Sequence, residues 1–166
     1  VSADFNYGAS FGLSNIQSSD SGYTATVTLQ SLTITVRDYS SQTGTAGDYA
    51  EALAAAKSAL DESPYNINDA ETRYDQAKAI HDYVCETLTY SSTTEGRLYQ
   101  TVYSALVAPY HTVCAGYSKA FKVLCDEYGI PCVLVSGEGT NSTGKTEAHM
   151  WNYVQMEDGN WYAVDC

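Results

Sequence analysis

Apolar and polar residues alternate along residues 23–37, which predicts a half-buried strand or a bent pair of strands. The preceding residues, 1–22, are rich in Ser, Gly and Asn with scattered aromatics, and they predict a loose arm or an irregular edge. The composition of residues 40–47 is typical of a linker. We therefore expect an N-terminal arm over residues 1–47, with one strand or strand pair, ahead of one compact domain over residues 48–166.

The spacing of apolar residues changes to three and four positions in the next part of the chain, as on one face of a helix. Two amphipathic helices are predicted this way, over residues 48–60 and 68–88. Each begins with a capping box, Asp-x-x-Glu in the first and Asn-x-x-Glu in the second. A short helix is expected over residues 98–107.

A third long helix is predicted from a cap at Thr112 to about Tyr128. Gly129 stands where a left-handed residue ends many helices, Ile130 supplies the accompanying hydrophobic contact, and Pro131 prevents continuation. These three residues predict where the helix ends.

Short apolar runs then predict a strand over residues 132–136 and a hairpin of two strands over residues 147–156 and 161–166. Residues 137–145, rich in Gly, Ser and Thr, predict a flexible loop between them. Helices followed by an antiparallel sheet indicate an α+β fold and not a wound parallel sheet.

Composition narrows the classes of function. The 166 residues are 44% hydrophobic and 17% charged, which favours a packed domain over disorder, and no apolar run suggests membrane insertion. The formal charge of −12 would repel phosphate groups, so we expect no nucleic-acid partner. A hydroxyl-rich, Lys-poor, acidic chain is typical of secreted bacterial proteins, and we expect an extracellular or cell-surface location.

The first candidate for chemistry is Cys114, in the first turn of the third helix. Unpaired N–H groups and the helix dipole favour a thiolate there and lower the pKa of a cysteine. The small neighbours Ala115 and Gly116 leave the sulfur open to an incoming carbonyl group. The alternative is that Cys114 is a small buried hydrophobic residue, as free cysteines often are.

A thiolate nucleophile needs an imidazole, which in turn needs a group that fixes its tautomer. His149 begins the first strand of the hairpin. A three-residue turn over residues 157–159 would place Asp165 opposite Trp151, on the same face as His149. A two-residue turn would put His149 and Asp165 on opposite faces. The alternative is an edge hairpin with one polar His and one surface Asp.

The other two histidines are weaker candidates. His81 lies in the apolar stripe of the second predicted helix and favours a core position, whereas His111 lies in the loop before Cys114 and could approach it. His81 and Cys85, one helical turn apart, could share a metal ion. No second pair completes four ligands, and we expect no metal.

The five cysteines leave the disulfide pattern open; they are Cys85, Cys114, Cys125, Cys132 and Cys166. If Cys114 is a free nucleophile, the other four allow three connectivities, or none. Cys114 and Cys125 would lie ~16 Å apart along one helix, too far for a disulfide. Cys166 adjoins Asp165, where a disulfide could brace the last strand or distort it.

Four segments resemble the motifs of bacterial transglutaminase-like domains, in the same order: Val113–Phe121, Gly129–Gly137, His149–Val154 and Gly159–Asp165. The resemblance implies a papain-like α+β fold in which the nucleophile helix packs on an antiparallel sheet. It also implies a triad of Cys114 as nucleophile, His149 as general base and then acid, and Asp165 as orienting carboxylate.

The resemblance implies thiol-dependent acyl transfer on a peptide or protein amide, either cysteine protease-like hydrolysis or transfer to an amine. Hydrolysis is favoured because water needs no second binding site. No cofactor is implied. The backbone N–H of Cys114 is the first oxyanion donor, and the second remains open among Tyr90, Tyr103, Tyr110 and His111. Two alternatives remain: an idle module that binds peptide or cell-wall material, and a disulfide-braced surface module in which Cys114 is oxidised.

Overall fold

The computed structural model describes residues 3–19, 22–38, 46–92, 98–140 and 143–166. These fall into two compact units, Ala3–Tyr39 and the part from Ser40 to Cys166. None of the helices in the described ranges is long and apolar enough to cross a membrane.

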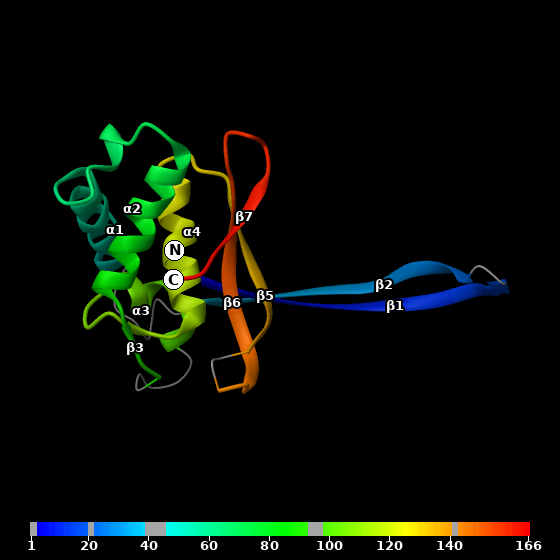
Figure 1. Cartoon of the computed structure of the whole chain (residues 1–166). Helices are drawn as coiled ribbons and strands as arrows, with labels where there is room; N and C mark the ends of the chain where they lie inside the picture. Colours follow the sequence, from blue (N-terminus) through cyan, green and yellow to red (C-terminus); the bar gives the residue numbers. More distant parts are fainter. Residues whose placement is uncertain (1–2, 20–21, 39–45, 93–97, 141–142) are drawn as a thin grey trace. The chain divides into compact units, whose positions relative to one another are not determined.

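The first unit is a hairpin of strands β1 (Ala3–Ser19) and β2 (Gly22–Asp38), which pair antiparallel along their whole length (Figure 1). The expectation of a loose arm over residues 1–22 was therefore wrong for β1. The ladder shifts register between Ser10 and Phe11 and again between Ser14 and Gln17. The extra residue lies in β2 at the first shift and in β1 at the second, so the pairing is irregular in both strands.

The second unit contains the helices and the remaining strands (Figure 1). Its elements are α1 (Ala46–Asp61), η1 (Ile67–Asp69), α2 (Arg73–Thr87), β3 (Thr89–Tyr90), η2 (Leu98–Gln100), α3 (Val102–Leu106), β4 (His111–Thr112), α4 (Cys114–Glu127), β5 (Cys132–Thr140), β6 (Thr146–Gln155) and β7 (Trp161–Val164). The last three form an antiparallel sheet in the order β5-β6-β7, and β3 pairs with β4 in parallel. The predicted α+β class is confirmed.

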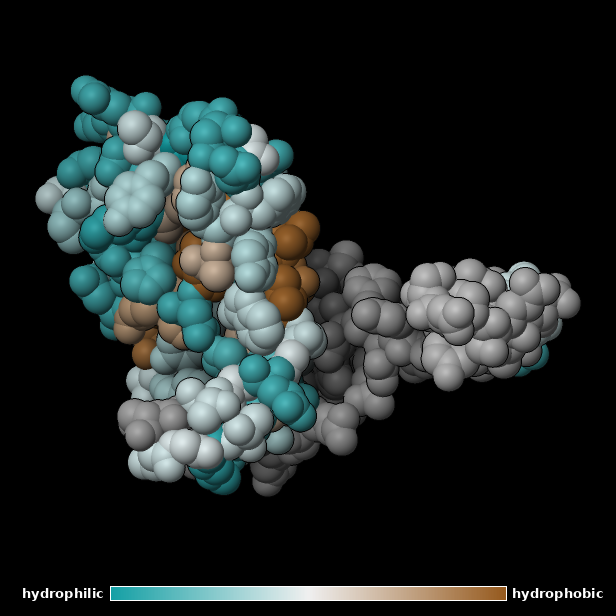
Figure 2. Space-filling view, turned by 45° about the vertical axis from the view of Figure 1, so that its right-hand side comes forward, coloured by the Kyte–Doolittle hydropathy of each residue, from teal (hydrophilic) through white to brown (hydrophobic). Residues whose placement is uncertain are grey.

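Helix α4 lies between the other helices and the sheet, and it supplies much of the core (Figure 1). Its buried residues include Phe121 and Leu124, which belong to one apolar cluster with Ile80 of α2 and Val154 of β6. The outer surface is mostly hydrophilic, with brown hydrophobic atoms gathered in the middle of the visible face (Figure 2). The packing of α4 on both layers fixes the position of its first residue, Cys114.

Three predicted caps differ from the structure. Asp48 lies within the first turn of α1, which already begins at Ala46. Helix α4 begins directly at Cys114, and its N-cap is Val113, which has no side-chain cap. The Thr112 side chain is fully buried and donates a hydrogen bond to the Tyr99 carbonyl oxygen at 2.6 Å, so it serves the core and not the helix start. In α2 the cap is Thr72, not Asn68, because the Thr72 hydroxyl accepts from the Asp75 N–H.

The end of α4 follows the prediction. Gly129 has a φ of 67°, and the Ile130 N–H donates to the Cys125 carbonyl oxygen at 2.8 Å, the contact that closes such a helix end. Ile130 is buried against the core.

Gly116 is required by the buried Thr112. A Cβ at Gly116 would lie 1.7 Å from Thr112 Oγ1, in a helix packed on both sides. We expect Gly116→Ala to lower the free energy of unfolding by about 3 kcal/mol, measured by denaturant titration. Gly129→Ala is the comparison. A Cβ at Gly129 would meet no atom within 4 Å, so only the positive φ disfavours alanine there. We expect this variant to lose about 1 kcal/mol of the free energy of unfolding. Equal losses for the two variants would contradict the packing argument.

The predicted three-residue turn is confirmed. The Met156 N–H donates to the Asn160 carbonyl oxygen at 2.9 Å, Gly159 has a φ of 80°, and the ladder pairs Asn152 with Val164. The ladder ends at this pair, one residue before Asp165, and the contact between Asp165 and His149 shows that the two lie on the same face.

The predicted loop over residues 137–145 is shorter in the structure. Strand β5 continues to Thr140 and pairs with β6, so that Gly137 lies opposite His149 and Gly139 opposite Glu147. Glycine, which disfavours strands in general, is used here because large side chains on β6 need the space.

Candidate active site

His149 and Asp165 are in direct contact. His149 Nε2 lies 2.8 Å from Asp165 Oδ2 and 3.0 Å from Oδ1. An ionised carboxylate only accepts hydrogen bonds, so this contact puts the imidazole proton on Nε2 and leaves the lone pair on Nδ1. The pair is open to solvent, with 29% of the His149 side chain and 58% of the Asp165 side chain exposed. The arrangement provides an oriented base with one free ring nitrogen.

The imidazole is also held by Trp151, two residues along β6. The two rings are stacked, with centroids 5.9 Å apart and planes inclined by 19°. Gly139 and Gly137 of β5 leave room for these side chains. A Cβ at Gly139 would lie 3.1 Å from His149 Cβ, and one at Gly137 would lie 2.8 Å from Trp151 Cη2. The Gly-x-Gly and His-x-Trp patterns are the signal in the sequence that could have revealed this packing.

Cys114 is the first residue of α4, and it is half-buried. The Ser118 hydroxyl lies within hydrogen-bond distance of two carbonyl oxygens, that of Cys114 at 2.9 Å and that of Met150 at 2.8 Å, and its single proton can go to either. Met150 directly follows His149. The backbones at Cys114 and at Met150, the neighbour of His149, therefore both lie next to Ser118, while the assignment of Cys114 and His149 as partners stays a prediction.

A second bond supports the same junction. Asn152 is buried and donates to the Ser118 carbonyl oxygen at 3.1 Å, from the face of β6 opposite to His149. Asn152 therefore anchors the strand to α4.

Tyr90 lies beside Cys114. Partial burial raises the pKa of the Tyr90 phenol, and the neighbouring Cys114 and Glu147 contribute to the shift. Among the four residues considered for the second oxyanion donor, Tyr90 has a described contact with Cys114. Tyr103 has its pKa raised by burial and by Asp48, away from this site.

Asp165 also lines a groove of about 840 Å³. It is lined by α2, by the turn between β6 and β7 and by β7, with His81, Asp82 and Tyr162 among its residues. Neither Cys114 nor His149 is among the residues that line it, so the groove adjoins Asp165 and not Cys114.

The glycine at 139 gives a test of the imidazole position. We expect Gly139→Ala to displace the His149 ring by a few tenths of an ångström and to slow turnover by about tenfold, with an unchanged denaturation midpoint. The matched control is Glu138→Ala, an exposed side chain on the other face of β5, which should retain the wild-type rate. Equal rates for both variants would contradict the close packing of β5 against the ring.

Solved structures of known proteins resemble this fold. A transglutaminase described as "a TGase" matches with a TM-score of 0.58 at 16% identity, over 96% of this chain and 44% of its own. A putative cysteine protease from Cytophaga hutchinsonii matches with a TM-score of 0.52 at 18% identity, over 99% of this chain and 66% of its own. The periplasmic domain of TgpA from Pseudomonas aeruginosa, bound to ethylmercury, matches with a TM-score of 0.51 at 16% identity, over 95% of this chain and 64% of its own. The chain spans less than two thirds of each, and at these identities the likeness shows the fold.

One curated protein also matches in part. A probable serine/threonine-protein kinase, SIS8 of Arabidopsis thaliana, is 35% identical over 65 residues, which is 37% of this chain and 6% of that protein. Because the match covers so small a part of the kinase, it says nothing about the activity of this chain.

The family model of the transglutaminase-like superfamily matches residues 63–166, which hold α2, the Cys114 helix and the whole sheet with His149 and Asp165. The match covers more than half of the sequence and agrees with the papain-like fold of the structural neighbours. The chain belongs to the transglutaminase-like superfamily.

Proposed function

We propose that this domain catalyses thiol-dependent acyl transfer on a peptide or protein amide, with Cys114, His149 and Asp165 as the triad. The observation that carries the proposal is the His149–Asp165 contact at 2.8 Å through Nε2, which leaves Nδ1 as the base, on the strand tied to the first turn of α4. Superfamily membership supports the reaction class.

In the first half of the reaction, His149 Nδ1 takes the proton of the Cys114 thiol, and the thiolate attacks the amide carbonyl carbon. The Cys114 N–H at the start of α4, which contacts the Tyr90 oxygen in the structure, turns to the oxyanion, with Tyr90 beside it as the second candidate donor. The imidazolium then protonates the leaving amine, and a thioester remains on Cys114. Asp165 stabilises the imidazolium while it exists.

In the second half, His149 deprotonates the acceptor, which attacks the thioester and releases the Cys114 thiol. We propose water as the main acceptor because it needs no binding site of its own. The charge of −12 favours cationic or amine-bearing substrates over anionic ones. The periplasmic neighbour supports a substrate on the extracellular side, at or near the cell surface.

Intact mass spectrometry tests the proposal. The protein is incubated with peptide amides and activated peptide esters, with and without a fluorescent primary amine. We expect an acyl adduct on Cys114 that hydroxylamine removes, and more free acid than amine-coupled product. Coupled product in excess would make the amine the acceptor. Absence of an adduct on Cys114 across these substrates would contradict the proposal and favour an idle binding module.

A further inference from the structure

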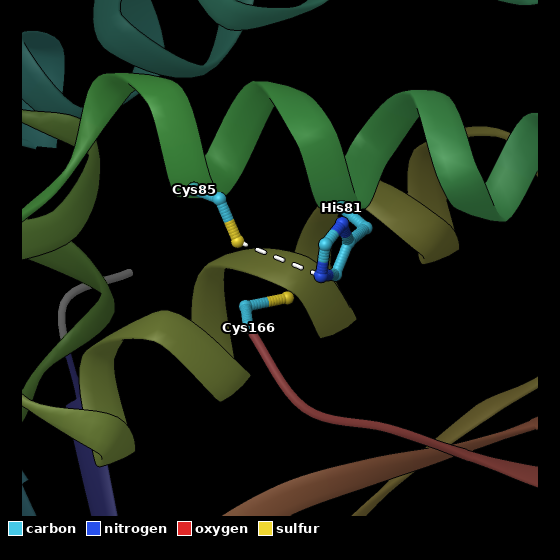
Figure 3. Close-up of side chains that lie close together, drawn as sticks. All are labelled: His81, Cys85 and Cys166. Atoms are coloured by element: carbon cyan, nitrogen blue, oxygen red, sulfur yellow. Dashed lines mark hydrogen bonds between the residues drawn. The ribbon is translucent and has the colours of Figure 1, made fainter.

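A cluster of sulfur and nitrogen atoms lies outside the candidate active site. His81 and Cys85 of α2 and Cys166, just past β7, place their ligating atoms within 4.8 Å of one another (Figure 3). His81 Nε2 lies 3.6 Å from Cys85 Sγ, and His81 Nδ1 lies 3.0 Å from Asp82 Oδ1. Residues 85 and 166 are far apart in sequence, so only the fold brings these thiols together.

From this geometry we infer that Cys85 and Cys166 form a disulfide that ties the end of β7 to α2. Both sulfur atoms lie near the His81 ring (Figure 3), and the two thiols are close enough to form a hydrogen bond with each other. Cys85 is exposed, and an exposed thiol beside a second thiol oxidises readily in the extracellular compartment proposed here. The protein around the sulfur atom of Cys85 removes part of its hydration, which raises the pKa of the thiol. A base is therefore needed to form the thiolate, and His81 lies 3.6 Å away.

The arrangement of the other cysteines agrees with this pairing. Cys125 and Cys132 are both buried and are in contact with each other, since a hydrogen bond between the thiols raises the pKa of Cys125 and lowers that of Cys132. Four of the five cysteines therefore lie as two neighbouring pairs. Cys114 is left as the free thiol, as its proposed role requires.

The Cys85–Cys166 bond would form by thiol–disulfide exchange, in which a second molecule that contains a disulfide is the oxidant. His81 Nε2 takes the Cys85 proton, and the Cys85 thiolate attacks one sulfur of the partner disulfide, whose other sulfur leaves as a thiolate and takes up that proton from His81. His81 then takes the Cys166 proton, and the Cys166 thiolate attacks the Cys85 sulfur and displaces the first partner sulfur, which leaves with the second proton. Two thiols are oxidised, and one partner disulfide is reduced to two thiols. His81, the proton acceptor in both steps, lines the groove described above.

The disulfide would act on the active site through Asp165. The β6–β7 ladder ends at Asn152 and Val164, so Asp165 lies one residue past the paired strand and is followed at once by Cys166. A covalent link at Cys166 holds the backbone of Asp165 in place and keeps its carboxylate on His149 Nε2. This effect rests on the proposed triad, whereas the disulfide draws only on the proposed extracellular location.

Peptide mapping of the full chain under non-reducing conditions, after exposure to oxidised glutathione, tests the pairing. We expect a peptide that links Cys85 to Cys166 and disappears on reduction, with Cys114 free. Both thiols free under these conditions, or either one joined to another cysteine, would overturn the inference. Zinc bound in equal amount, with both thiols protected until a chelator is added, would also overturn it and make the cluster a metal site.

The effect on Asp165 is tested with the double variant Cys85→Ser and Cys166→Ser. We expect Cys114 to be alkylated about tenfold more slowly at pH 6 than in the oxidised wild type, with the pH profile moved toward that of an ordinary thiol. Reduced wild-type protein should behave like the variant. Identical profiles in all three would refute the positioning role. If Cys114 behaves as an ordinary thiol even in the oxidised protein, the triad fails and the mapping still decides the disulfide.

Discussion

Replacement of Cys114 by alanine is expected to lower the rate of acyl transfer by at least about 10⁴-fold, because no other group in the site can form the thioester. Cys114 is only half-buried at the first position of α4, so the variant should unfold at the wild-type denaturant concentration. Turnover of a peptide substrate at saturating concentration measures the loss.

The matched control for this variant is Lys122→Ala, which removes an ion pair with Asp126 from the outer face of the same helix. It should keep the wild-type rate, since surface ion pairs contribute little to stability. A Cys114→Ala protein that retains more than about a tenth of wild-type activity would exclude covalent catalysis at this residue.

Replacement of Asp165 by asparagine is expected to lower turnover by about 10²- to 10³-fold. The amide keeps the shape of the side chain, but it no longer stabilises the imidazolium and it can turn its N–H groups toward His149 Nε2. That ring nitrogen would then lose its proton to Nδ1, the atom that must accept the proton of Cys114. The exposure of Asp165, 58% of its side chain, weakens its electrostatic effect and keeps the loss below that of Cys114→Ala.

Asp158→Asn is the control for Asp165. Asp158 lies in the turn of the same hairpin, where it accepts a hydrogen bond from Tyr162 at 2.7 Å, and it has no contact with His149. The rates of the two variants, measured between pH 5 and 9, should differ by at least about 30-fold. Equal rates would mean that Asp165 is an ordinary surface carboxylate.

Sequence analysis predicted the hairpin because the turn chemistry there is local. Glycine at 159 fixes the three-residue turn, and the turn fixes the register that brings Asp165 to His149. The end of α4 was predicted for the same reason, since Gly129 and Ile130 act within one turn of the helix. Features that depend on a few neighbouring residues can be predicted in this way.

Features that depend on distant parts of the chain were missed. Thr112 resembles a helix cap in sequence, but its hydroxyl bonds Tyr99 and Ser104, which lie in other elements. The glycines of β5 resemble a loop until β6 places Trp151 and His149 against them. In the same way, no spacing in the sequence relates Cys85 to Cys166, whereas the packing of α2 beside β7 brings the two thiols together.

The central claim is that Cys114 and His149 act as a thiolate–imidazolium pair. The most direct test is the rate of iodoacetamide alkylation from pH 4 to 9, resolved for each cysteine by peptide mass spectrometry, in the wild type and in His149→Ala. We expect Cys114 alone to react rapidly at mildly acidic pH, and to lose that reactivity in His149→Ala. A Cys114 that reacts only above about pH 8, with the same profile in both proteins, would contradict the account.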